Sequence, residues 1–145
     1  MHIETLTSIH KPAMRALIEA IHAEQGLLPQ FYWPQELLGA EMATAEAVGA
    51  FENNVLIGFV LYRELPEAFE ISLVASHPQY RRRGAMEKVF EYLVNAKGQE
   101  RELWLEVHEE NVPAQKLYEK LGFKEIRRRP RYYKDGATAI LYSHS

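Results

Sequence analysis

The sequence predicts an α/β or α+β fold in which a mixed sheet carries helices on its faces. Two observations point to this class. Short apolar runs with strand character alternate with segments whose apolar residues recur at helical spacing, in the order β-α-α-β-β-β-α-β-α-β-β. In the middle of this order, a buried strand, a tight glycine-containing loop and an amphipathic helix follow one another directly over residues 69–94.

The first elements are expected to be one strand and two helices. Residues 2–6 alternate between polar and apolar types and are predicted to form the first strand. A helix with Pro12 in its first turn is predicted from apolar residues at helical spacing, which are Met14, Leu17, Ile18 and Ile21. Residues 27–33 form an aromatic, loop-like segment, and Pro34 is expected to begin a short helix that reaches about Ala40.

A hairpin and a further strand are predicted next. Residues 47–51 and 55–62 are apolar runs joined by the turn at 52–54, whose two asparagines tolerate positive φ. Gly58 lies inside the second run, which predicts a β-bulge or a close approach of another group to the backbone. A turn at 65–67 then leads into the apolar strand 69–76.

The loop after this strand has the features of an anion-binding site. Three arginines run into Gly84, and the helix that follows buries one face, formed by Met86, Val89, Phe90, Leu93 and Val94. The beginning of a helix presents unpaired backbone N–H groups and the positive end of the helix dipole. A pyrophosphate is therefore the expected ligand of this loop.

The second half of the chain predicts a strand, a helix and a final pair of strands. Residues 103–107 form the strand, Asn111 is a suitable N-cap, and Pro113 fits the first turn of the helix. The apolar face of that helix consists of Ala114, Leu117, Tyr118 and Leu121, and Gly122 ends it. The last strands, 123–129 and 137–142, are joined by a Lys-Asp-Gly turn at 134–136.

Composition excludes several classes of function. The chain has 145 residues, 47% of them hydrophobic, which is enough for one domain with a core, so residues 1–145 are expected to form a single domain. The absence of cysteine excludes disulfides, thiolate metal sites and a cysteine nucleophile.

The net charge of −3 argues against nucleic-acid binding, and no apolar run approaches the ~20 residues of a membrane span. Six histidines show no metal-ligand spacing, so no metal is predicted, and a cytoplasmic location is expected.

Two motifs resemble those of the GNAT N-acetyltransferases. Arg81-x-x-Gly84-x-Met86 is similar to their acyl-CoA pyrophosphate loop, R/Q-x-x-G-x-G/A, and departs from it at Met86. The run W-L-E-V at 104–107, followed by N-x-x-A-x-x-L-Y at 111–118 and G-F at 122–123, is similar to the elements that complete the site. With the tyrosines at 132 and 133, the chain most resembles the RimI-type ribosomal-protein-alanine N-acetyltransferases, over about residues 69–141.

The resemblance implies a mostly antiparallel sheet, acetyl-CoA as co-substrate, and direct attack of an amine without a covalent acyl-enzyme. The residues that it assigns to acetyl-CoA binding are Val74, Ala75, Ser76, Arg81, Arg82, Arg83, Gly84, Ala85, Met86, Asn111 and Tyr118. The strand around 74–76 should donate a backbone N–H to the thioester carbonyl, which gains negative charge during attack. A split between this strand and the strand at 103–107 would form a V-shaped cleft for the pantetheine arm.

Glu106 and Tyr118 hold the positions of the catalytic base and acid in this resemblance. Glu106 would accept the proton of the acceptor ammonium, and partial burial would strengthen it as a base; otherwise it is a surface residue at a strand end. Tyr118 would protonate the departing thiolate, or serve only as a core tyrosine. His108 shares a strand face with Glu106 and is expected to be a surface histidine, with a proton relay as the alternative.

The acceptor is predicted to be a protein or peptide N-terminus, contacted by Trp33, Tyr132 and Tyr133. An α-amine has a pKa of about 8, whereas a lysine amine has a pKa of about 10.4. A weak base such as Glu106 therefore removes the proton of an α-amine more easily. A small amine or a lysine side chain remains an alternative acceptor. A non-catalytic acyl-CoA-binding module also remains open, because Met86 could crowd the pyrophosphate loop. The sequence does not decide between a monomer and a homodimer.

Overall fold

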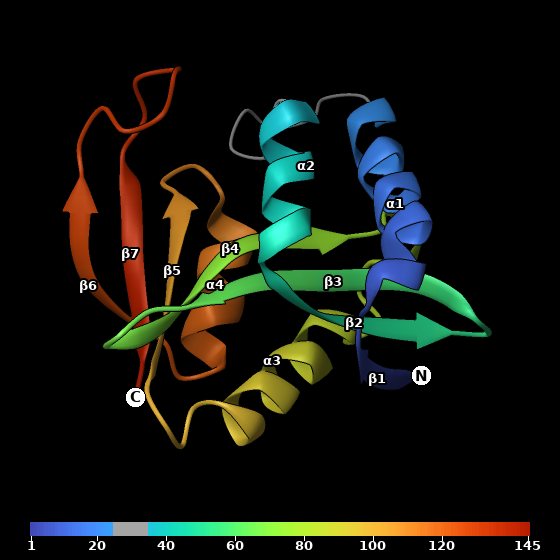
Figure 1. The fold of residues 1–145 in the computed structure, drawn as a ribbon. Coiled ribbons are helices and arrows are strands. Elements are labelled where there is room, and N and C mark those ends of the chain that lie inside the picture. Colours follow the sequence, from blue (N-terminus) through green and yellow to red (C-terminus); the bar gives the residue numbers. More distant parts are fainter. Residues whose placement is uncertain (25–34) are drawn as a thin grey trace.

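The computed structural model describes residues 1–24 and 35–145, and its framework is a seven-stranded sheet (Figure 1). The strands lie in the order β1-β2-β3-β4-β5-β7-β6, and every neighbouring pair is antiparallel except β4 and β5, which run parallel. This mixed, mostly antiparallel sheet confirms the predicted fold class. The strands are β1 His2–Thr5, β2 Glu46–Glu52, β3 Val55–Glu64, β4 Ala68–Ser76, β5 Glu102–His108, β6 Lys124–Arg129 and β7 Ala139–His144.

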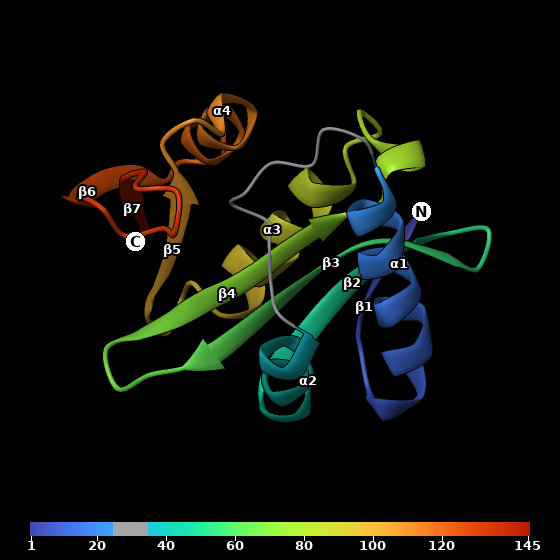
Figure 2. The same cartoon turned by 90° about the horizontal axis from the view of Figure 1, so that it is seen from above.

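Helices cover both faces of the sheet. The first face carries α1 (Lys11–Ala23) and α2 (Gln35–Thr44), and the opposite face carries α3 (Ala85–Ala96) and α4 (Val112–Lys120), as Figures 1 and 2 show. Short 3-10 turns, η1 (Ser8–His10) and η3 (Pro78–Tyr80), precede α1 and the loop to α3. The observed order of elements is the predicted one. Within the described residues, no helix is long and apolar enough to cross a membrane.

Each face of the sheet has its own apolar core. The core under α3 includes Val89, Phe90 and Leu93, packed against Ile57 and Val60 of β3. The core under α1 and α2 contains the four apolar residues at helical spacing in α1, packed against Phe59 and Leu61 of β3. Because β3 is covered on both faces, its residues 56–62 are buried without alternation, as is usual for a central strand.

The hairpin between β2 and β3 has the predicted turn, since Asn53 and Asn54 both adopt positive φ, at 51° and 67°. Other boundaries differ from the prediction. Helix α2 continues to Thr44 rather than ending near Ala40. Strand β7 covers residues 139–144 instead of 137–142, because the N–H of Ala137 is taken by the Asp135 side chain and its carbonyl accepts the N–H of Tyr132.

Candidate active site

Strands β4 and β5 diverge, and this opens the sheet. They pair only at one end, where Ala68, Phe69 and Glu70 lie opposite Glu102, Leu103 and Trp104. Beyond that point β4 pairs only with β3, and β5 only with β7. The predicted V-shaped split is therefore present, and the far end of β4 has a free edge on the side that faces β5 (Figure 2).

The free edge of β4 carries backbone donors. The N–H of His77 donates to the carbonyl of Ile57 at 2.9 Å, so it points toward β3. Successive N–H groups of an extended strand point to opposite edges, so those of Ser76 and Val74 point away from β3 and into the split. Ala75 has the other orientation, and its methyl group is fully buried in the core under α1. Val74 and Ser76 are thus the candidates for donation to a thioester carbonyl.

A cleft of about 810 Å³ lies at the open end of this split. It is formed by the end of α1, the end of β4, the loop and first turn of α3, and the first turns of α4. All of the residues predicted to bind acetyl-CoA line it except Ala75. Residues far apart in the sequence are therefore brought to one cavity.

The loop before α3 has the backbone geometry of an anion cradle. Gly84 is the N-cap of α3 and adopts φ 75°, a conformation that favours glycine, and Arg82 adopts φ 64°. The first helical hydrogen bond runs from the N–H of Lys88 to the carbonyl of Gly84. The N–H groups of residues 85–87 therefore have no partner within the helix and are available to a ligand.

The three arginines of the loop are not equivalent. Arg81 pairs with Glu24 at the end of α1, with N–O distances of 2.9 and 3.1 Å, and Arg83 pairs with Glu52 at 2.6 Å. These two ion pairs hold the loop to α1 and to β2. Arg82 forms no ion pair with any described residue, and it lines the cleft, so it is the arginine of this loop whose charge is available to a phosphate.

Met86, the departure from the family motif, has a partner in the sheet. Its side chain is 9% exposed, and its Cε lies only 2.5 Å from the place where a Cβ on Gly58 would be. The absence of a side chain at Gly58 thus provides the space for the end of Met86. The predicted close approach at Gly58 is confirmed, and the group that approaches is a side chain of α3. Much of Met86 is therefore directed into the sheet rather than across the loop.

Helix α4 supplies two predicted residues to the cleft. Asn111 caps the helix, since its side-chain oxygen accepts the N–H of Ala114 at 3.3 Å. Tyr118 is 5% exposed and packs edge-on against Phe90, with ring centres 5.5 Å apart. Burial raises the pKa of Tyr118, and the nearby phenol of Tyr133 adds to the rise, so the hydroxyl stays protonated at neutral pH.

Glu106 lies on the opposite face of β5 from the residues of the α3 core. Its side chain is 27% exposed, does not line the cleft, and is 3.6 Å from Nη1 of Arg129 on β6. Tyr132, half of whose surface is exposed, lies close enough to Glu106 for the carboxylate to influence its phenol. Burial raises the pKa of Tyr132, and the negative charge of Glu106 raises it further. The predicted base is therefore partly covered by the segment between β6 and β7.

Tyr133 interacts electrostatically with both predicted catalytic residues, Glu106 and Tyr118. Its pKa is raised, first by burial and then by the charge of Glu106, and its phenol in turn affects Tyr118. Its ring also contacts the ring of His108, with centres 4.8 Å apart. Trp33, the third residue predicted to contact the acceptor, lies outside the described residues.

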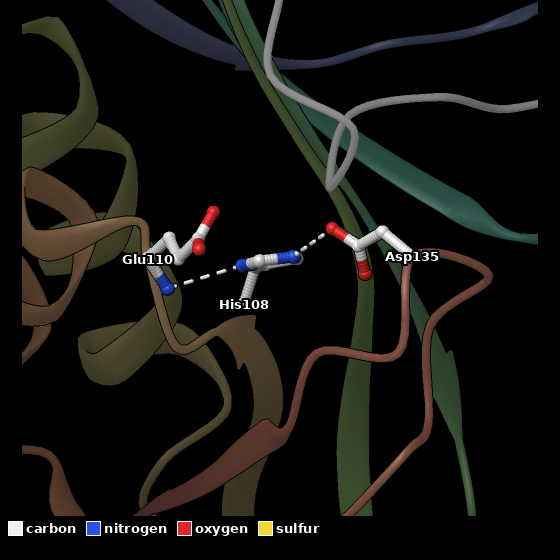
Figure 3. A group of neighbouring side chains, drawn as sticks. All are labelled: His108, Glu110 and Asp135. Atoms are coloured by element: carbon white, nitrogen blue, oxygen red, sulfur yellow. Dashed lines mark hydrogen bonds and ion pairs between the residues drawn. The ribbon is translucent and has the colours of Figure 1, made fainter.

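His108 is buried, so the expectation of a surface histidine was wrong. It is 1% exposed because the Asp135 turn and Tyr133 cover the end of β5. Figure 3 shows its ring between the backbone of Glu110, whose N–H donates to Nδ1 at 3.0 Å, and Asp135, whose carboxylate lies 2.8 Å from Nε2. With Nδ1 as acceptor, Nε2 carries the proton and donates it to Asp135.

These three side chains also place their potential metal ligands within 4.8 Å of one another. Both ring nitrogens of His108 are already engaged, however, and the Asp135 carboxylate also accepts the N–H of Ala137 at 3.0 Å. The group is therefore complete as a hydrogen-bond network that ties β5 to the segment carrying Tyr132 and Tyr133. The sequence predicts Asp135 only as a turn residue. Its partner His108 is 27 residues away in the sequence, so no local pattern indicates the contact.

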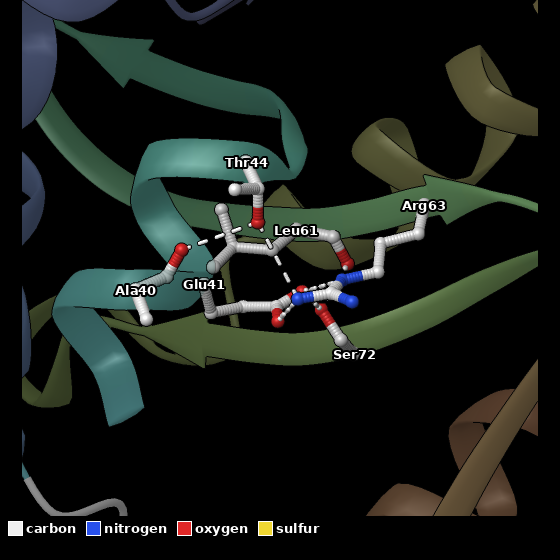
Figure 4. A network of polar contacts seen from close by, with 6 residues as sticks. All are labelled: Ala40, Glu41, Thr44, Leu61, Arg63 and Ser72. Carbon is white, nitrogen blue, oxygen red and sulfur yellow. Dashed lines mark hydrogen bonds and ion pairs between the residues drawn. The ribbon is translucent and has the colours of Figure 1, made fainter. Parts of the chain in front are cut away.

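A second polar network fixes α2 to the sheet on the face opposite the cleft. Glu41 is 7% exposed and accepts from Nε of Arg63 at 2.8 Å, from the Arg63 Nη2 group and from the Ser72 hydroxyl at 2.6 Å (Figure 4). A buried carboxylate is stable only when several donors surround it, and here β3 provides two through Arg63 and β4 one through Ser72. The network sets the position of α2 relative to the split in the sheet.

The chain belongs to the acetyltransferase (GNAT) family, whose model matches residues 6–123. An N-alpha-acetyltransferase of Sulfurisphaera tokodaii is 33% identical over 129 residues, which cover 78% of this chain and 75% of that one. A Mycobacterium leprae protein described as uncharacterized is 34% identical over 116 residues, which cover 75% of this chain but only 32% of that longer protein.

Solved structures agree with the family. The crystal structure of the ribosomal-protein-S18-alanine N-acetyltransferase from Escherichia coli superimposes with a TM-score of 0.83 at 26% identity, covering 99% of this chain and 92% of that one. The chain therefore has the fold and acyltransferase chemistry of its family, and the resemblance in the two motifs is confirmed at the level of the family.

Proposed function

We propose that this protein transfers the acetyl group of acetyl-CoA to the α-amino group of protein or peptide N-termini. The observation that carries the proposal is the cleft at the split between β4 and β5, where an anion-binding loop, two free backbone donors and Tyr118 meet. The named activities of the Sulfurisphaera tokodaii and Escherichia coli relatives support the choice of an N-terminal acceptor.

In the proposed reaction, the cofactor enters from the cleft and the acceptor from the other side of the split. The pyrophosphate would bind to the first N–H groups of α3 and to Arg82, and the thioester carbonyl to the free edge of β4. The amine nitrogen forms a bond to the acetyl carbon, the carbon–sulfur bond breaks, and the sulfur leaves as a thiolate. The acceptor proton passes to Glu106, and the Tyr118 hydroxyl donates to the sulfur.

The raised pKa of Tyr118 bears on its proposed role. A phenol that remains protonated at neutral pH is always ready to donate. It is a weaker acid than a free thiol, so its contribution belongs to the transition state, where negative charge develops on sulfur. A strong hydrogen bond at that moment stabilises the leaving group without requiring a tyrosinate.

The acceptor class is tested by offering acetyl-CoA together with peptides that have free N-termini, the same peptides with blocked N-termini and an internal lysine, and free polyamines. We expect acetylation of the free α-amines alone, located by fragmentation in a mass spectrometer. Transfer to polyamines or lysine, with none to peptide N-termini, would replace this acceptor with a small amine or a side chain. Binding of acetyl-CoA without any transfer would leave only an acyl-CoA-binding module.

A further inference from the structure

Glu106 and Arg129 form an ion pair at the place where the proposed acceptor amine must lose its proton. Nη1 of Arg129 is 3.6 Å from Oε1 of Glu106, and its guanidinium carbon lies 5.6 Å from the centre of the Tyr132 ring. The two contacts hold the arginine over the carboxylate. A cation therefore already occupies the position beside the predicted base.

An acceptor enters the proposed reaction as an ammonium ion, and it must reach the same carboxylate. Glu106 has a side chain that is only 27% exposed, and Arg129 already lies beside it, so there is little room for a second cation. The ammonium and Arg129 must then compete for it. Arg129 is 43% exposed and can swing outward, because β6 is an edge strand with every residue exposed.

We infer that Arg129 is a specificity-determining residue: it leaves Glu106 when the acceptor amine binds and then pairs with a carboxylate of the acceptor. This inference rests on the proposed N-terminal acetyltransferase function. Arginine binds carboxylates in a bidentate manner, so an acidic acceptor offers the displaced guanidinium a better partner than water. The favoured substrates are therefore N-termini with Asp or Glu close to the amine.

The geometry limits where that acidic residue can be. Glu106 and Arg129 are direct neighbours, and an extended chain advances at most ~3.3–3.6 Å per residue. A carboxylate in the first or second residue of the acceptor can reach Arg129, whereas one several residues further on cannot. Because the new ion pair is partly exposed to water, its effect is modest, about two- to fivefold in kcat/KM.

The test compares four peptides that are identical except for Asp or Asn at position one or at position two. Each is acetylated by the wild-type protein, by Arg129→Gln and by Arg128→Gln. Arg128 is the matched control, since it lies next to Arg129 on the same strand but pairs with Glu125, at 2.9 and 3.0 Å. We expect wild type and Arg128→Gln to prefer Asp at one of the two positions by about two- to fivefold. Arg129→Gln should lose this preference and show an unchanged or lower KM for the Asn peptides.

Equal rates on Asp and Asn peptides with the wild-type protein would overturn the inference, with the acetyltransferase function intact. An acidic preference that persists in Arg129→Gln, or that disappears equally in Arg128→Gln, would overturn it too, since the preference would then come from another group or from general charge. If none of the four peptides is acetylated, the proposed function fails and takes this inference with it.

Discussion

Tyr118 is both a packing residue and the predicted acid, and the two roles can be separated by removing one atom. In Tyr118→Phe the ring contacts with Phe90 and Phe123 remain, so the free energy of unfolding should change little. General acid–base catalysis contributes typically ~10²–10⁴-fold, so kcat should fall by about that factor while acetyl-CoA affinity persists. Rapid-quench measurement of a single turnover checks this, and a wild-type rate of the chemical step would reduce Tyr118 to a core residue.

Asp135 gives a prediction about pH. The N–H of Ala137 and, next, the bond from His108 hold the pKa of Asp135 below its usual 3.8. A depressed pKa in the folded state means that the carboxylate stabilises the fold above about pH 4, and that this contribution is lost as pH falls through the lower, folded-state value. Asp135→Asn should therefore lower the Tm at pH 7.

The same comparison at about pH 3 gives the second half of this test. There the difference in Tm between the wild-type protein and Asp135→Asn should shrink, because the wild-type carboxylate is increasingly protonated in both states. Thermal unfolding followed by circular dichroism measures both values. A difference that is as large at pH 3 as at pH 7 would show that the charge of Asp135 is not what stabilises the contact with His108.

At the scale of elements, the junction of β4 and α3 depends on Gly84. A valine there must adopt φ 75°, which is strained for a β-branched residue, and its side chain would enter the open space of the cleft, since a Cβ meets no protein atom within 4 Å. We expect the Kd for acetyl-CoA to rise about tenfold or more. Gly136→Val is the matched control, with φ 84° and equally open space but no place in the cleft. By calorimetry, equal Kd values for the two variants would argue against the pyrophosphate loop.

The contact between α3 and β3 predicts an energetic coupling. Gly58→Ala should cost about 1–3 kcal/mol of stability, because the new methyl group collides with the end of Met86, and Met86→Ala about 2–5 kcal/mol through the cavity it leaves. In the double variant the methyl group partly fills that cavity. Its cost should be smaller than the sum by more than ~0.5 kcal/mol, measured by denaturant unfolding. Strict additivity would mean that the two residues do not share this space.

The elements themselves were largely predictable from local sequence signals. The amphipathic period of α1 and α3, the asparagines of the hairpin and the cap at Asn111 each depend on neighbours within a few residues. The start of β7 was placed too early because the Asp135 side chain captures the N–H of Ala137, a competition that apolar patterning does not register. The same loop also buries His108, which the sequence alone predicts to be a surface residue.

For the whole molecule, the sequence identified many of the cleft residues but not the contacts that arrange them. The motif resemblance named Gly84, Asn111 and Tyr118, and the structure brings them to one cavity. It gave no sign that Gly58 makes space for Met86, or that Arg129 pairs with Glu106, because these partners are 28 and 23 residues apart and meet only through the sheet. Such pairs carry no local signal.

The proposed reaction requires that cofactor and acceptor enter from opposite sides of the split between β4 and β5 and meet there. A conjugate in which CoA is joined through an acetyl linker to the N-terminal nitrogen of a peptide spans both sides at once. Its Kd, measured by calorimetry, should be lower than that of acetyl-CoA by a factor of about 10² or more, as expected for an analogue that links both substrates. A Kd equal to that of acetyl-CoA would contradict this arrangement, because it would show that the acceptor side takes no part in binding.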